Sequence, residues 1–207
     1  MYIPLFKRVL DIVFSAVLIV LLAPVMLFTW LAVRIVLGAP AIYRDERAGL
    51  DGQPIEIAKF RSMTAATGPD GCLLPDADRL GPFGRFLRRT SLDELPQLLS
   101  VLAGDMSLVG PRPLPVRYVA RYTPRQATRL LVRPGLTGWA QIHGRNAVAW
   151  PERLEYDAEY VESMQFWTAP LTDFWIVLVT MVQIVWQGIT GRGVSAPGSA
   201  TMQEFFP

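Results

Sequence analysis

The chain has 207 residues, of which 51% are hydrophobic and 18% are charged, with a net charge of +2; soluble domains typically carry roughly 25% charged residues. This length and composition predict one domain, at most with an appendage, and exclude a disordered chain. The single cysteine, Cys72, and the single histidine, His143, exclude an internal disulfide framework and a Cys/His zinc site.

An uncharged apolar stretch runs from Ile12 to Val33. As a helix of about 22 residues it would be about 33 Å long, enough to cross a hydrocarbon core of about 30 Å. The stretch is longer than the apolar core of a signal peptide, and no small-residue cleavage site closes it. It therefore predicts a membrane segment.

Pro24 lies in the middle of this stretch and predicts a kink, because proline removes a helix hydrogen bond. Each arm would then be about 17 Å long, enough to reach the middle of the bilayer and return. The positive-inside rule favours neither orientation of a straight span, because basic residues lie on both sides: Lys7, Arg8, Arg34, Arg44 and Arg47. Proline also occurs in ordinary transmembrane helices, so these residues leave a spanning helix and a re-entrant hairpin both open.

The middle of the chain predicts one short strand and several short helices. Alternating apolar and polar side chains predict a strand over Ile55–Phe60. Helices are expected over Phe83–Arg89, Leu95–Leu102, Pro115–Tyr122, Pro124–Val132 and Glu152–Met164. Thr123 is the expected N-cap of the helix that begins at Pro124. The expected fold class is mostly α with a small β element (α+β).

A second apolar stretch, Phe174–Ile189, is shorter than the roughly 20 residues that a span requires. Its polar side chains fall along one helix face: Thr180, Gln183 and Gln187. With Trp175 and Trp186 as anchors, the stretch predicts an amphipathic helix that lies in the membrane interface. A buried core helix is the alternative.

The segment from Arg79 to Arg133 contains ten arginines and no lysine against three acidic residues. Some of these arginines recur every four residues: Arg117, Arg121, Arg125, Arg129 and Arg133. Such a row fits either anionic lipid headgroups or a solvated helix face. Neither interleaved aromatic residues nor a groove-reading motif accompanies the row, so nucleic acid is not an expected partner.

Two adjacent carboxylates, Asp93 and Glu94, lie among these arginines at the start of an expected helix. Ser91 and Glu94 would form a capping box, but Pro96 would then interrupt the helix. With Asp93 as N-cap, Pro96 falls in the first turn, where its missing N–H is not needed. Either arrangement places the acids at the positive end of the helix dipole and near guanidinium groups, which favour the ionised form. An ionised aspartate can attack phosphorus when arginines and Mg²⁺ reduce the repulsion between anions.

These residues belong to longer motifs that resemble the bacterial sugar transferases, specifically the short, single-domain monotopic phosphoglycosyl transferases. The main motifs are Leu92-Asp93-Glu94-Leu95-Pro96-Gln97, Gly104-Asp105-Met106-Ser107-Leu108-Val109-Gly110-Pro111-Arg112-Pro113 and Arg133-Pro134-Gly135-Leu136-Thr137-Gly138-Trp139-Ala140-Gln141. Shorter matches are Lys59-Phe60-Arg61-Ser62-Met63, Gly144-Arg145-Asn146, Tyr156-Asp157 and Ala200-Thr201-Met202. The resemblance covers nearly the whole chain.

The resemblance implies a ping-pong reaction in which Asp93 attacks the β-phosphoryl group of a UDP-sugar and UMP leaves. A polyprenyl (undecaprenyl) phosphate then takes the sugar phosphate, which begins synthesis of a surface glycan. Glu94 is similar to the family residue that associates with Mg²⁺ beside the nucleophile, so Asp93 and Glu94 are the implied metal pair. The implied substrate-binding residues are Lys59, Arg88, Arg112, Arg145 and Asp157.

The resemblance also implies a re-entrant helix over residues 1–40, a catalytic domain with interfacial helices over 41–207, and a monotopic enzyme on the cytoplasmic face of the bacterial inner membrane. The family often has serine before the kink proline, where this chain has Ala23, so the kink depends on Pro24 and on packing. Two functions from other classes remain open: a membrane-anchored scaffold that binds lipid or a partner, and a magnesium-dependent pyrophosphatase. The residues do not specify the oligomeric state or the sugar.

Overall fold

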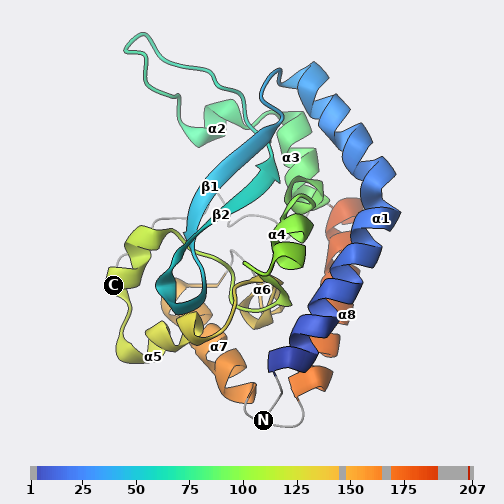
Figure 1. Cartoon of the computed structure of the whole chain (residues 1–207). Helices are drawn as coiled ribbons and strands as arrows, with labels where there is room; N and C mark the ends of the chain where they lie inside the picture. Colours follow the sequence, from blue (N-terminus) through green and yellow to red (C-terminus); the bar gives the residue numbers. More distant parts are fainter. Residues whose placement is uncertain (1–3, 145–147, 165–168, 191–204, 206–207) are drawn as a thin grey trace.

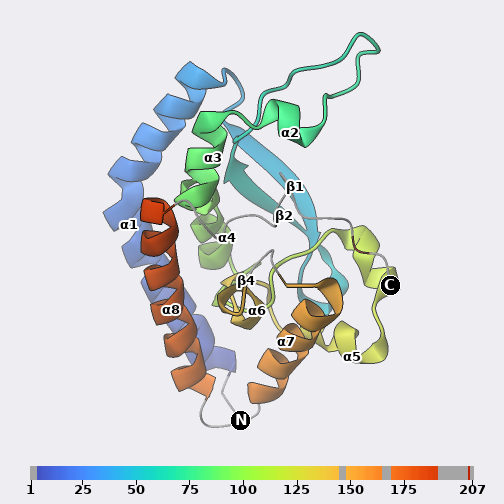
Figure 2. The same cartoon turned by 180° about the vertical axis from the view of Figure 1, so that it is seen from behind.

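The computed structural model describes residues 4–144, 148–164, 169–190 and 205. The fold is mostly helical with two small two-stranded sheets, which confirms the expected mix of mostly α with a small β element. Two long helices, α1 (Pro4–Val36) and α8 (Ala169–Thr190), lie along one side of the molecule, and the shorter elements form a body beside them (Figures 1 and 2).

Helix α1 runs without interruption through Pro24. Figure 1 shows it bent part-way along its length, with the bend pointing away from the body and both ends returning to it. A proline inside a helix removes one backbone hydrogen bond and produces such a bend. The structure contains one continuous helix rather than two antiparallel arms, so the re-entrant hairpin stays a prediction.

The outer surfaces of α1 and α8 are apolar. Large exposed side chains include Leu5, Val20 and Ile35 on α1, and Phe174, Trp186 and Ile189 on α8. Both helices are long and apolar enough to cross a membrane. The alternative that the second apolar stretch forms a buried core helix is therefore wrong.

The polar face of α8 is turned towards the body. The Thr180 hydroxyl lies 2.6 Å from that of Thr137, and Gln183 Nε2 donates to the Ile142 carbonyl at 2.9 Å. This arrangement confirms an amphipathic helix, although α8 extends beyond the predicted Phe174–Ile189 at both ends.

Strand β2 (Pro54–Phe60) confirms the expected strand, and it pairs in antiparallel register with β1 (Ile42–Ala48), which the sequence analysis did not predict. The charged residues of β1 obscured it, because they lie on a hairpin that exposes much of its surface. A short 3-10 turn, η1 (Leu50–Gly52), joins the two strands. A second, parallel pair is formed by β3 (Ser107–Val109) and β4 (Gly135–Thr137).

Glycine is required at position 135, where β4 begins. A Cβ atom at Gly135 would lie 2.0 Å from the backbone nitrogen of Gly110, so a side chain would push the two segments apart. The segment after β3, which carries Arg112, therefore packs directly against the backbone that enters β4.

The remaining helices include the five that were expected, with two differences in type, and two short ones, at residues 76–79 and 139–142, that were not predicted. They are α2 (Asp76–Arg79), α3 (Pro82–Arg89), α4 (Gln97–Ala103), η3 (Val116–Arg121), α5 (Pro124–Ala127), η4 (Thr128–Leu131), α6 (Trp139–Ile142) and α7 (Trp150–Ser163). The predicted Pro115–Tyr122 helix is the 3-10 helix η3, and the predicted Pro124–Val132 helix divides into α5 and η4. Thr123 caps α5 as expected, in a capping box with Gln126.

Buried apolar side chains join the elements that surround the 3-10 turn η2 (Leu92–Glu94). One cluster packs Val33 of α1 against Phe60 of β2 and Leu87 of α3. Another packs Ile57 of β2 against Val101 of α4, next to Met106. Helix α3, strand β2 and helix α4 are thereby held around the carboxylates of η2.

Candidate functional site

Asp93 and Glu94 lie on η2, between α3 and α4. Ser91 adopts a left-handed conformation with a φ of 56°, its side chain caps no helix, and Pro96 directly precedes α4. Ser91 stands at the N-cap position of η2 without forming the predicted capping box, and the N-cap of α4 is Pro96 rather than Ser91 or Asp93. The chain makes a separate turn, because the left-handed residue interrupts the helical path. Both carboxylates consequently lie on a short turn before the helix.

Glu94 is bound by two cations. Its Oε1 atom accepts a hydrogen bond from Lys59 Nζ at 2.8 Å and another from Arg112 Nη2 at 2.6 Å. Burial raises the pKa of Glu94, but Arg112 and Lys59 outweigh it and hold that pKa well below its usual range. Glu94 is therefore an anion across the physiological pH range.

Asp93 is 7% exposed, and within the described residues no hydrogen bond or ion pair reaches its carboxylate. Burial and the neighbouring Glu94 charge raise the pKa of Asp93 to about 7, against the opposing effects of Lys59, Arg88 and Arg112. The expectation that its surroundings favour the ionised form is therefore wrong for Asp93. The physical reason is that burial and the Glu94 charge outweigh the nearby cations, two of which, Lys59 and Arg112, bind Glu94 directly.

Three elements bring cations to these two acids. Lys59 comes from β2, Arg88 from α3 and Arg112 from the segment after β3. Burial lowers the pKa of Arg88, and Asp93 is the acid that opposes this most strongly. Arg88 Nε also donates to Ser62 Oγ at 3.0 Å, which orients its guanidinium group. The structure thus brings together five of the predicted site residues.

Asp157, on α7, does not contact these residues through its carboxylate. Its Oδ2 atom accepts a hydrogen bond from Arg129 Nε at 3.1 Å and forms an ion pair with Arg129 Nη2 at 2.9 Å. Burial raises the pKa of Asp157 even though Arg129 opposes this effect. Arg129 in turn donates to the Arg112 carbonyl at 2.6 Å and to the Tyr122 hydroxyl at 2.8 Å. Asp157 therefore supports the backbone of Arg112 through Arg129.

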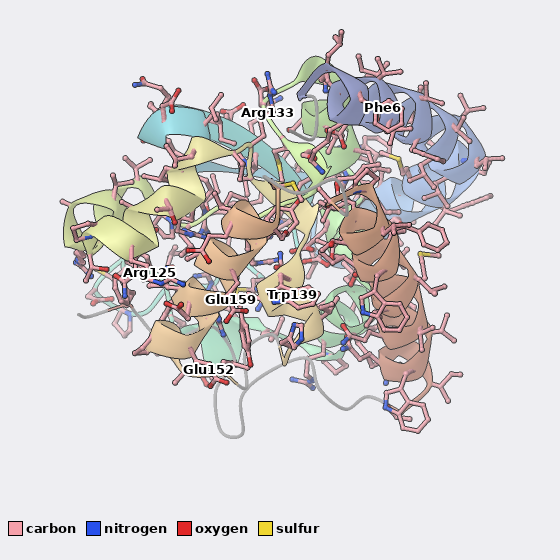
Figure 3. The ribbon with its side chains drawn as sticks, turned by 90° about the horizontal axis from the view of Figure 1, so that it is seen from below. Phe6, Arg125, Arg133, Trp139, Glu152 and Glu159 are labelled. Carbon is pink, nitrogen blue, oxygen red and sulfur yellow. The ribbon has the colours of Figure 1, made fainter. Side chains whose placement is uncertain are left out.

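The row of arginines does not form one surface. Arg129 is buried, Arg133 Nε donates to the Gly104 carbonyl at 2.8 Å, and exposed Arg125 pairs with Glu155 and Glu162 of α7. Figure 3 shows Arg125 on the opposite side of the molecule from Phe6 of α1. Because Arg129 is buried, the row is neither a single lipid-binding face nor a single solvated helix face. Sequence spacing gave no sign that Arg129 is buried, because its carboxylate partner lies on a distant helix.

Arg145 lies outside the described residues, so its predicted role has no structural test. In the part of the chain that the structure describes, no cluster of three or more histidine, cysteine, aspartate or glutamate side chains is placed to hold a metal ion. Asp93 and Glu94 are adjacent carboxylates, and the repulsion between them contributes to the raised pKa of Asp93. Such a pair fits Mg²⁺, which often takes one or two carboxylates and completes its shell with water and substrate phosphate oxygens.

The site combines a carboxylate that no group in the described part of the chain binds directly with nearby cations from three elements. At neutral pH a group with a pKa of about 7 is present in both protonation states, and the ionised form is nucleophilic. The surrounding guanidinium and ammonium groups are typical ligands of phosphate oxygens. The arrangement is therefore suited to nucleophilic attack on phosphorus.

Comparison with known proteins agrees with this chemistry. The family model described as "Bacterial sugar transferase" matches residues 2–187. The chain is 41% identical over 199 residues to a protein of Bacillus subtilis named "Uncharacterized sugar transferase EpsL", covering 96% of this chain and 95% of that one. It is also 41% identical to the UDP-glucose:undecaprenyl-phosphate glucose-1-phosphate transferase of Caulobacter vibrioides, covering 86% and 69% of the two chains. The undecaprenyl-phosphate galactose phosphotransferase of Salmonella typhimurium is 38% identical, over 78% of this chain and 37% of its own length.

Proposed function

Because the chain belongs to the bacterial sugar transferase family, we propose that it transfers a sugar 1-phosphate from a UDP-sugar to a polyprenyl phosphate such as undecaprenyl phosphate. The observation that carries the proposal is the Asp93 carboxylate, which no group of the described residues binds directly although Lys59, Arg88 and Arg112 lie close enough to influence its pKa. The names of several relatives, which pair a UDP-sugar or galactose with undecaprenyl phosphate, support the same reaction.

The proposed reaction has two displacements at one phosphorus atom. In the first, an Asp93 carboxylate oxygen bonds to the β-phosphorus of the UDP-sugar, and the bond from that phosphorus to the bridging oxygen breaks, so UMP leaves with the bridging oxygen. In the second, a phosphate oxygen of the polyprenyl phosphate bonds to the same phosphorus, and the bond to Asp93 breaks. The carboxylate is regenerated, and the product is a polyprenyl diphosphate sugar.

The neighbouring residues would prepare the site for both displacements. Arg88 and Arg112 would bind phosphate oxygens and hold the phosphorus atom in line with Asp93. Lys59 and Arg112 fix Glu94, which prevents the second carboxylate from turning towards the incoming anion. Asp93 and Glu94 would hold Mg²⁺. When bound, this ion would neutralise charge on the phosphate oxygens and favour the ionised form of Asp93.

The two apolar helices support a place at the membrane for this reaction. One substrate is soluble and the other carries its phosphate at the level of the lipid headgroups. We propose that α1 enters the bilayer from the cytoplasmic face of the bacterial inner membrane and returns at its Pro24 bend, with the apolar face of α8 in the interface. The outward bend of α1 and the exposed apolar side chains of both helices support this monotopic arrangement (Figure 2).

The test is UMP release from a panel of UDP-sugars by the purified, detergent-solubilised protein, with Mg²⁺ and undecaprenyl phosphate. The panel includes UDP-glucose and UDP-galactose, which the relatives suggest, and N-acetylated UDP-hexosamines. We expect at least one donor to release UMP, and Asp93→Asn to reduce that release by at least about 10⁴-fold, as expected when a nucleophile is removed. Asp78→Asn, at an exposed aspartate on α2, is the matched control and should retain activity.

The proposed intermediate has its own measurement. Intact-protein mass spectrometry after incubation with the donor alone should show the added mass of one sugar phosphate, and the Asp93→Asn variant should not gain it. UMP release that needs only water as acceptor would favour a pyrophosphatase. Liposome binding without UMP release from any donor would favour a scaffold, and either result would overturn the proposal.

A further inference from the structure

Asp11 is a buried acid on the apolar helix α1. It is 4% exposed, and it is the first acidic residue of the chain, with no other before Asp45. Its Oδ1 atom accepts hydrogen bonds from Ser107 Oγ at 3.0 Å and from the Leu108 backbone N–H at 2.9 Å. An acid on a membrane helix is costly and is commonly retained for a function, so this contact requires an explanation.

Both partners of Asp11 belong to β3, and β3 leads directly to the active site. The chain passes from Val109 through Gly110 and Pro111 to Arg112, whose guanidinium group binds Glu94 at 2.6 Å. The Gly110 backbone packs so closely against Gly135 that this short connection has little freedom to shift. A displacement of β3 would therefore be transmitted to Arg112.

The end of β3 is also tied to the membrane helices. The Tyr160 hydroxyl lies 3.1 Å from the Val109 carbonyl and 2.8 Å from Asp173 Oδ1 on α8. Asp173 in turn pairs with Lys7 of α1 at 2.5 Å. All three residues of β3 are thus held by polar groups connected to α1 or α8.

The same turn of α1 also holds the helix that follows the catalytic acids. Arg8 lies three residues before Asp11, and its guanidinium group donates to the carbonyls of Val101 and Leu102 at 2.6 and 2.7 Å. These carbonyls belong to the last turn of α4, which begins just after Glu94 and Pro96. One turn of α1 therefore contacts both the segment that leaves the carboxylates and the segment that delivers Arg112.

We propose that Asp11 is a positioning residue of the active site, which acts through β3 to place the Arg112 guanidinium group against Glu94. The inference rests on the proposed function, since its readout is UMP release. Helix α1 then has two tasks: its apolar surface contacts lipid, and its polar side chains near the N-terminus set the geometry of the catalytic cations.

The experiment compares Asp11→Ala with Asp11→Asn in the full-length protein. Alanine removes the acceptor and leaves two buried donors unpaired, whereas asparagine retains an oxygen that can accept both hydrogen bonds. We expect Asp11→Ala to lower kcat for UMP release roughly 10- to 100-fold, because small displacements of catalytic groups have effects of this size. Asp11→Asn should stay within about threefold of the wild type. Ser15→Ala, a buried polar position of α1 that bonds only to the Ile12 carbonyl in its own helix, is the matched control and should not change kcat.

A double-mutant cycle with Arg112→Lys separates positioning from general damage to the fold. If Asp11 acts through Arg112, then Asp11→Ala should lower the kcat of the Arg112→Lys protein by less than about twofold. Ser107→Ala removes only one of the two hydrogen bonds, so it provides the same cycle if Asp11→Ala does not fold. The inference would be overturned, while the proposed function stands, if Asp11→Ala lowered kcat by the same factor in the wild type and in the Arg112→Lys protein. An Asp11→Ala protein with wild-type kcat would overturn it in the same way. A wild type that releases no UMP from any donor would overturn both.

Discussion

Turn η2 and helix α7 each bury an aspartate near arginines, but the two carboxylates differ in whether an arginine binds them directly. Asp157 on α7 accepts a hydrogen bond from Arg129 Nε and forms an ion pair with its Nη2. Asp93 on η2 receives none from the described residues, because Lys59 and Arg112 are bound to Glu94. Burial raises the pKa of both aspartates. The difference indicates that the paired carboxylate stabilises the fold, whereas the unpaired one remains available to react.

The largest expected effect on stability comes from the paired aspartate. Asp157→Asn would leave the Arg129 guanidinium group buried without its counter-ion, which typically costs roughly 3–5 kcal/mol. We expect a clear fall in Tm by thermal unfolding in detergent, with Glu155→Gln, at an exposed acid on the same helix, as the control. An unchanged Tm together with complete loss of UMP release would instead indicate that Asp157 acts in catalysis. It would contradict the assignment of Asp157 to stability and of Asp93 to reaction.

Glu94 extends the comparison between bound and unbound carboxylates to the site itself, because Lys59 and Arg112 bind Glu94 and not the neighbouring Asp93. Glu94→Gln would remove the anion that orients Lys59 and Arg112 and one of the two proposed Mg²⁺ ligands. We expect UMP release to fall roughly 10²- to 10³-fold, the size of effect seen when one preorganised electrostatic group is removed. The Mg²⁺ concentration required for half-maximal rate should also rise. Glu56→Gln, at an exposed acid of β2 paired with Arg44, is the control, and equal activity of the two variants would contradict the assignment.

Asp93, the unpaired aspartate, should lower the free energy of unfolding at neutral and alkaline pH. Its folded pKa of about 7 lies above the ordinary aspartate value of 3.8, so the protonated form favours folding. This contribution is complete below the unfolded pKa and is lost as the pH rises through about 7. In EDTA, Asp93→Asn should therefore have a higher Tm than the wild type at pH 8, by the equivalent of about 1.4 kcal/mol or more, since one pKa unit has this value. The gain should shrink at pH 5, and an equal difference at both pH values would contradict the burial of an ionised Asp93.

Sequence motifs predicted which side chains meet at η2, but not how the protons and hydrogen bonds are distributed among them. Asp93, Glu94, Lys59, Arg88 and Arg112 gather as expected. The pKa of Asp93 could not be predicted, because it depends first on the burial of its carboxylate and then on its charged neighbours, and Asp93 lies on a short turn that follows the left-handed residue Ser91. A local pattern of residue types does not specify such a turn.

Long-range contacts limited the sequence analysis elsewhere. The amphipathic pattern of α8 was readable because a helix brings residues three and four apart to one face. Asp11 and Arg129 were not recognised, because their partners are 97 and 28 residues away in the chain. Strand β1 was missed because its charged residues do not alternate cleanly, although its register with β2 is complete from Ile42 to Ala48.

The smallest effect is expected at Arg125, which the sequence places in the same row as Arg129. Arg125 is exposed and pairs with Glu155 and Glu162, whereas Arg129 is buried with Asp157. Exposed ion pairs contribute little, because water and salt screen both partners. Arg125→Ala should therefore leave Tm unresolved from the wild type and change UMP release by less than about twofold, whereas Arg129→Ala should lower Tm strongly. If instead the two variants behaved alike, burial would not be what separates these positions, and the contrast between the paired and the unpaired aspartate would lose its physical basis.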